Sequence, residues 1–118
     1  MKTKNILITY LDGSEYWYLN GLPHRVDSPT YERSDGRKEW WANGKFHRED
    51  GPALEYPDGH KEWYLNGKRH RINGPAIEYT DGFKAWWYDN KKYDKIEYYS
   101  LMVKLGHMTK TQAFVEMI

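Results

Sequence analysis

The chain has 118 residues, enough for one domain with a modest core. Its net charge is +1, without the basic excess that binds a phosphate backbone, so we predict no general nucleic-acid binding. The sequence has no cysteine, which excludes disulfides and thiolate metal sites, and 17% of its residues are aromatic. Few aliphatic and many aromatic side chains favour a thin sheet covered by rings.

The first residues, MKTKNILITYLDG, predict a strand rather than a signal peptide. Their apolar run is short and meets Asp12-Gly13 without a small-residue cleavage site. No segment is long enough to span a bilayer, so we predict no membrane insertion. The expected location is the cytoplasm.

One pattern recurs along most of the chain with a step of 23 residues. Several landmarks that keep one phase indicate a repeat array. Asp-Gly pairs begin at Asp12, Asp35, Asp58 and Asp81, and the tryptophans are Trp17, Trp40, Trp63 and Trp86. Asn-Gly pairs begin at Asn20, Asn43 and Asn66, His-Arg pairs at His24, His47 and His70, and the prolines are Pro29, Pro52 and Pro75.

Each copy predicts two short strands joined by the Asp-Gly turn, because glycine accepts the positive φ of tight hairpin turns. In the third copy the strands are 53–56 and 60–65. Alternation predicts one face of tryptophans with aliphatic residues and a second face of rings with glutamates. The second face would carry Tyr18, Trp41, Tyr64 and Trp87, with Glu32, Glu55 and Glu78. The predicted fold is mainly β: an open antiparallel meander of stacked hairpins, about eight strands from four repeats.

The fourth copy departs from the pattern, and helical signals follow it. Asp94 with Glu97, and Thr109 with Gln112, form two capping-box signatures, and Gly106 is a plausible helix stop. We therefore predict a repeat array over residues 1–93 and one or two C-terminal helices over residues 94–118. The helices would cover one open edge of the sheet, which would otherwise invite edge-to-edge pairing.

The 23-residue step, an aromatic-x-Asn-Gly-Lys pattern and a following histidine resemble MORN-type repeats. The matching positions are Trp41, Asn43, Gly44, Lys45 and His47, and then Tyr64, Asn66, Gly67, Lys68 and His70. The resemblance covers about Leu7 to Tyr93. Arg48 and Arg71 replace the family's glycine after the histidine, and Glu39 and Glu62 replace a glycine before the aromatic residue. The chain thus resembles divergent MORN-like proteins of bacteria and phages, some of them antitoxins, which implies an interaction scaffold. If a phage encodes the chain, the expected location is the host cytoplasm.

The repeated histidines favour a structural role over metal binding. Equivalent residues two strands apart lie roughly 10 Å from each other, whereas zinc needs nitrogens at about 2.0–2.1 Å from itself. We predict a hydrogen bond that fixes each loop, with Asp27, Asp50 or Asn73 as partners, and no metal or cofactor. Because a catalytic site is normally one unrepeated constellation, we also predict no enzyme activity.

The predicted function is protein binding, as a small inhibitor or antitoxin that acts by binding a partner protein. The alternative is a nucleotide or glycan binder that uses the aromatic face, and the oligomeric state stays open. Specificity should come from residues that are not repeated, in the loops after Asn-Gly and in the tail, although the tail can also serve only as a cap. The candidate partner-binding residues are Tyr64, Trp87, Lys68, Arg69, Trp41, Tyr98, Tyr99 and Met102.

Overall fold

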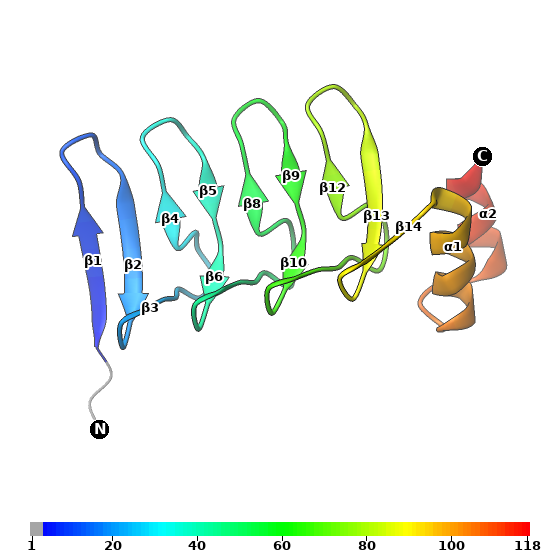
Figure 1. Ribbon diagram of the computed structural model, residues 1–118, viewed down its shortest axis with the longest axis horizontal. Helices are drawn as coiled ribbons and strands as arrows, with labels where there is room; N and C mark the ends of the chain where they lie inside the picture. Colours follow the sequence, from blue (N-terminus) through cyan, green and yellow to red (C-terminus); the bar gives the residue numbers. More distant parts are fainter. Residues whose placement is uncertain (1–3) are drawn as a thin grey trace.

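The computed structural model describes residues 4–118, which form a row of antiparallel hairpins with two helices at one end (Figure 1). The wide hairpins are made by β1 (Asn5–Thr9), β2 (Glu15–Leu19), β4 (Tyr31–Glu32), β5 (Lys38–Glu39), β8 (Leu54–Glu55), β9 (Lys61–Glu62), β12 (Ile77–Glu78) and β13 (Lys84–Tyr88). These strands follow one another in chain order across an open sheet that ends with β14 (Lys91–Tyr93). The predicted capped meander is therefore confirmed, and it is thin, with extents of 48 × 37 × 19 Å.

The Asp-Gly pairs form the turns of the wide hairpins, and all of these turns lie at the same end of the strands (Figure 1). In the third hairpin the Gly59 N–H donates to the Tyr56 carbonyl at 3.1 Å, and Tyr56 N–H donates to the His60 carbonyl at 2.9 Å. Gly59 has a φ of +100°, and the Asp58 carboxylate accepts the His60 N–H at 3.0 Å. The loop thus has three residues and pairs Tyr56 with His60.

The Asn-Gly pairs form a second set of turns, at the opposite end of the strands. They close narrow hairpins in which β3 (Leu22–Pro23) pairs with β2, β6 (Trp41–Ala42) with β7 (Lys45–Phe46), and β10 (Tyr64–Leu65) with β11 (Lys68–Arg69). In the fourth copy, Asp89-Asn90 closes the hairpin of β13 and β14. The φ values at Asn66 and Gly67 are 50° and 78°, and Asp89 and Asn90 have 49° and 69°. The fourth copy therefore keeps this turn although its residues differ.

The strand predicted over residues 60–65 is interrupted at Trp63. There the N–H donates to the Ala76 carbonyl of the next repeat at 2.7 Å, and the carbonyl accepts the His70 N–H of its own loop at 3.2 Å. The chain leaves one pairing partner for another at this residue, so the segment divides into β9 and β10. Trp40 makes the same change between Ala53 and His47.

The assignment of aliphatic residues and glutamates to the two faces was wrong. Leu54 pairs with Glu62, so the aliphatic side chain shares the face of Glu62 and Tyr64. Glu55 lies on the tryptophan side, where its carboxylate is 3.6 Å from the Arg48 guanidinium. The cause is the three-residue loop, which opposes Leu54 to Glu62, whereas a two-residue turn would oppose Leu54 to Trp63.

The cap consists of α1 (Lys95–Lys104) and α2 (Lys110–Met117), which pack at the β13–β14 end of the sheet (Figure 1). Both predicted capping boxes are confirmed, at Asp94 and at Thr109. Gly106, with a φ of +81°, follows the end of α1 as predicted. The buried centre of the cap is made by Tyr98, Tyr99, Met102 and Ala113, against Trp86, Tyr88 and Tyr93 of the last repeat.

Candidate partner-binding surface

A row of aromatic rings crosses one face of the sheet. We call it the aromatic face, and its members are Tyr16, Tyr18, Tyr31, Trp41, Phe46, Tyr64, Arg69 and Trp87. Successive ring centroids are 4.6 Å apart for Tyr16–Tyr31, 5.8 Å for Tyr31–Trp41, 4.1 Å for Trp41–Phe46 and 5.1 Å for Phe46–Tyr64. All of these residues are partly exposed, so the row is both packed and accessible.

The narrow hairpins produce this row, because each places a ring beside its cross-strand partner. Trp41 pairs with Phe46, and Tyr64 pairs with Arg69. The Arg69 guanidinium carbon lies 6.0 Å from the ring centroid of Tyr64 and 4.9 Å from that of Trp87. Arg69 therefore continues the row between two rings at the position that Phe46 occupies one repeat earlier.

Two glutamates hydrogen-bond to the rings of the aromatic face, the buried Glu39 and the partly exposed Glu62. Glu39 is 4% exposed, and its carboxylate accepts from Arg33 Nε and from Trp41 Nε1 at 3.0 Å each. One repeat later, Glu62 accepts from the Tyr64 hydroxyl at 2.6 Å and lies 2.8 Å from His60 Nε2. These bonds fix the ring orientations before any partner arrives.

The fourth repeat lacks this support. Ala85 occupies the position of Glu39 and Glu62. The buried Trp87 Nε1, which corresponds to Trp41 Nε1, accordingly has no hydrogen-bond partner among residues 4–118.

The Tyr64 hydroxyl is protonated and acts as a donor at neutral pH. Burial raises its pKa, the hydrogen bond to Glu62 raises it further, and the nearby Arg69 guanidinium opposes both effects. Arg69 Nε donates to the same hydroxyl at 3.2 Å, and Arg69 also lies 3.8 Å from the Glu62 carboxylate. The result is a hydrogen-bonded polar group of Tyr64, Glu62 and Arg69, and the Arg69 guanidinium carbon lies 4.9 Å from the Trp87 ring centroid.

The structure brings together four of the eight predicted site residues, which are Trp41, Tyr64, Arg69 and Trp87. Lys68 pairs with Leu65 and so faces the other side, where its Nζ lies 3.4 Å from an Asp89 carboxylate oxygen.

The three remaining predicted site residues lie in the core of the cap. Tyr98, Tyr99 and Met102 are at most 2% exposed, so their assignment to a surface is corrected. Their amphipathic and flexible side chains fill the space above the last repeat. The exposed apolar residues of α2 are Phe114 and Val115, and the exposed Ile118 follows the helix as its C-cap.

Sequence reasoning missed three rings of the surface, Tyr16, Tyr31 and Phe46. Phe46 is the second residue after the Asn43-Gly44 turn, and cross-strand pairing in that narrow hairpin would have placed it beside Trp41. Tyr16 and Tyr31 pair with each other between the first and second repeats, in a register that the pattern within one hairpin does not give.

The opposite face, which we call the tryptophan face, carries three loops, each of which connects a narrow hairpin to the first strand of the next wide hairpin. These are loop 1 (residues 24–30), loop 2 (residues 47–53) and loop 3 (residues 70–76). In each loop an arginine stacks on a tryptophan, with the guanidinium carbon 4.6 Å from Trp17 for Arg25, 3.9 Å from Trp40 for Arg48 and 3.9 Å from Trp63 for Arg71. Each arginine also donates to the carbonyl of Pro29, Pro52 or Pro75.

The histidines fix the loops, but through partners other than those expected. His24 Nδ1 accepts the Asn43 N–H at 3.0 Å, and His47 Nδ1 accepts the Asn66 N–H at 2.9 Å, so each bond joins one repeat to the next. Asp50 instead accepts from Arg48 Nε in its own loop, at 3.0 Å. The N–H that each of these histidines accepts belongs to a residue 19 positions further along the chain, in the next repeat. Inspection of the residues next to each histidine could not reveal this partner.

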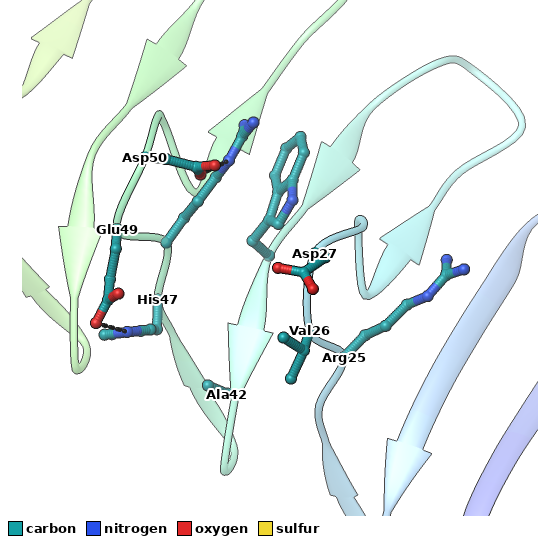
Figure 2. Close-up of a pocket in the computed structure, with 9 residues that line it drawn as sticks. Arg25, Val26, Asp27, Ala42, His47, Glu49 and Asp50 are labelled. Carbon is teal, nitrogen blue, oxygen red and sulfur yellow. Dashed lines mark hydrogen bonds and ion pairs between the residues drawn. The ribbon is translucent and has the colours of Figure 1, made fainter.

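Open grooves lie between successive loops. Figure 2 shows the groove between loops 1 and 2, with Arg25, Val26 and Asp27 on one side and His47, Glu49 and Asp50 on the other. Its volume is about 410 Å³, and the equivalent groove between loops 2 and 3 measures about 480 Å³. These sizes would hold a side chain or a small molecule.

Among residues 4–118, no group of three or more His, Cys, Asp or Glu side chains is arranged to hold a metal ion. Within the same range, no helix has the length and apolar character needed to cross a membrane. Comparisons with protein-family models, with curated proteins and with solved structures give no match to this chain.

Proposed function

We propose that this chain is a non-enzymatic protein-binding module whose aromatic face docks on a partner protein. The observation that carries the proposal is the unbroken row of partly exposed rings that ends in the Tyr64–Arg69–Trp87 cluster. Aromatic and arginine side chains dominate binding energy at protein interfaces. Because the rings are already held by Glu39 and Glu62, little side-chain freedom is lost on binding.

An inhibitor or antitoxin is the activity we propose for this module. An extended face of rigid rings is suited to covering a partner's functional surface, and the resemblance to small bacterial and phage repeat proteins supports the same role. The partner surface should include acidic groups, because Arg69 presents a partly exposed guanidinium at the centre of the cluster.

The test is capture of a partner from bacterial lysate by the parent chain, followed by affinity measurement with the purified partner. Trp87→Ala and Arg69→Gln should each weaken binding at least tenfold while the circular dichroism spectrum stays unchanged. Lys61→Gln is the matched control, because it removes one positive charge from an exposed position on the opposite face. If both test variants bind as tightly as the parent while Tyr18→Ala does not, the surface lies at the other end of the array.

A nucleotide- or glycan-binding function is the second candidate, because the grooves on the tryptophan face offer Trp, His and Arg side chains around volumes of about 410 and 480 Å³. Thermal unfolding with a panel of nucleotides and glycans separates the two functions. A ligand at a hundred times its Kd would stabilise the fold by about 2.7 kcal/mol. For a protein-binding module we expect no stabilisation by any member of the panel.

A further inference from the structure

Tyr98 of α1 occupies a site built from the backbone of loop 3. Its hydroxyl donates to the Arg71 carbonyl and accepts the Gly74 N–H at 3.3 Å. The side chain is fully buried, and its ring lies edge-on against Tyr99 with centroids 4.9 Å apart. A carbonyl and an N–H three residues apart thus form a receptor for one phenol hydroxyl.

Loop 2 has the same construction as loop 3. Arg48 Nε donates to the Asp50 carboxylate at 3.0 Å, and Arg48 Nη1 donates to the Pro52 carbonyl at 3.0 Å. In loop 3, Arg71 makes the corresponding bonds to Asn73 at 3.1 Å and to Pro75 at 2.9 Å.

The glycines of the two loops also correspond. A Cβ added to Gly51 would lie 2.9 Å from the Arg48 guanidinium carbon, and one added to Gly74 would lie 3.0 Å from that of Arg71. Arg48 and Gly51 therefore stand where Arg71 and Gly74 stand one repeat later.

The receptor groups of loop 2 are free. Among residues 4–118, neither the Arg48 carbonyl nor the Gly51 N–H has a hydrogen-bond partner. Both residues border the groove of about 480 Å³ between loops 2 and 3, together with Trp63 and Ile72. In the last repeat, the cap fills the corresponding space with Tyr98, Tyr99 and Met102.

We propose that this groove binds a tyrosine side chain of a partner protein, in the manner that loop 3 binds Tyr98. The phenol donates to the Arg48 carbonyl and accepts the Gly51 N–H, and its ring lies in the groove lined by Trp63. The exposed carboxylates of Glu49 and Asp50 at the rim favour a tyrosine flanked by basic residues. The site lies on the tryptophan face and is therefore independent of the proposed function of the aromatic face.

Loop 1 does not provide a second such site. Serine stands at position 28, where loops 2 and 3 have glycine, and Asp27 has a φ of +67°, unlike its counterparts Asp50 and Asn73. The backbone of loop 1 thus follows a different course, and the groove in Figure 2 borders neither Ser28 nor Pro29.

The test is an NMR titration of the ¹⁵N-labelled full chain with 4-methylphenol, the side-chain analogue of tyrosine. We expect a saturable shift of the Gly51 amide and of the Trp63 indole, and a Gly74 amide that stays in place because Tyr98 holds it. Toluene, which lacks the hydroxyl, and 4-methylanisole, which cannot donate, should shift Gly51 at least fivefold less. An unmoved Gly51 amide, or equal shifts with toluene, would overturn the proposal.

Two substitutions, one in each groove of the tryptophan face, test where 4-methylphenol binds. Ile72→Trp narrows the groove between loops 2 and 3 and should weaken 4-methylphenol binding at least fivefold. Val26→Trp is the matched control, since Val26 is the equivalent residue two repeats earlier, is also exposed, and lines the groove between loops 1 and 2. Equal binding by the Ile72→Trp chain, or equal weakening by Val26→Trp, would show that the phenol does not bind between loops 2 and 3.

Discussion

At the scale of single residues, Tyr98 joins the cap to the array because its hydroxyl donates one hydrogen bond to loop 3 and accepts another from it. Burial raises the pKa of Tyr98 to about 12, so the hydroxyl stays protonated and donates at neutral pH. Tyr98→Phe keeps the ring but leaves the Gly74 N–H and the Arg71 carbonyl without this partner. We expect the free energy of unfolding to fall by about 1–3 kcal/mol, measured by urea denaturation.

Tyr93→Phe is the control for this prediction, because the Tyr93 ring also packs against the cap but its hydroxyl has no hydrogen-bond partner among residues 4–118. It should change the free energy of unfolding by less than Tyr98→Phe does. Equal losses in the two variants would contradict the role given to the Tyr98 hydroxyl.

His70 predicts a dependence of stability on pH. Burial lowers its pKa below the ordinary value of 6.5, the Asp89 carboxylate opposes the shift, and His107 adds to it. Its Nδ1 accepts the Asp89 N–H at 2.9 Å, which requires the unprotonated nitrogen. Below pH 6.5 the unfolded chain gains a proton that the folded His70 resists, so stability present above pH 6.5 is lost as the pH falls through the lower, folded pKa.

The measurement is thermal unfolding between pH 7.5 and pH 5, beside the His70→Asn variant. The asparagine amide oxygen can accept the same N–H but does not titrate, so the variant should lose less stability over this range. A variant that follows the parent curve would assign the pH dependence to other groups.

At the scale of elements, substitutions of Gly59 measure how much the backbone conformation of an Asp-Gly turn contributes to stability. Its φ is +100°, and a Cβ added there would meet no atom within 4 Å. Gly59→Val should therefore lower the free energy of unfolding by about 1–2 kcal/mol through backbone strain alone. Gly59→Asn should cost less, because asparagine tolerates the left-handed region, as Asn90 does at a φ of 69°. Equal losses for valine and asparagine in chemical denaturation would contradict this explanation.

Turns and helix caps, which depend on neighbouring residues, could be predicted from the sequence. Features that depend on which strands pair, and in which register, could not. The turns at Asp58-Gly59 and Asn66-Gly67 and the capping box of Asp94 are determined by residues within a few positions of one another. The break at Trp63 arises because its N–H and its carbonyl bond to different repeats. The face of Leu54 depended on one residue of loop length, since a slip by one position reverses every side chain.

At the scale of the whole molecule, the candidate surface was only partly predictable for the same reason. The common phase of Tyr64 and Trp87 in the repeat placed both rings on one face, and their neighbour Arg69 follows from the narrow hairpin. The burial of Tyr98 and Met102 follows from how the cap docks on Trp86, which is a contact between distant parts of the chain. Residue type alone gives the same signal for a core and for an interface.

The array also predicts that one whole repeat can be removed. Deletion of residues 39–61 joins Lys38 to Glu62, which are consecutive positions of the pattern, and brings His24 to Asn66 in place of Asn43. Because each repeat contacts mainly its neighbours, the shortened chain should fold with the same circular dichroism shape and lower thermal stability. Its urea m value should fall by roughly a fifth, in proportion to the residues removed.

Deletion of residues 39–50 is the control, because it removes about half a repeat and joins Lys38 to Gly51 out of phase. The residues that replace β5 would then come from loop 2, and Glu39, Trp40 and Trp41 would be lost. The strands on either side, β4 and β8, would lack the partner with which each of them pairs. We expect this chain to be unfolded or aggregated although it retains more of the sequence than the whole-repeat deletion. If instead the half-repeat deletion folds and the whole-repeat deletion does not, the 23-residue unit is not the stacking unit of the protein.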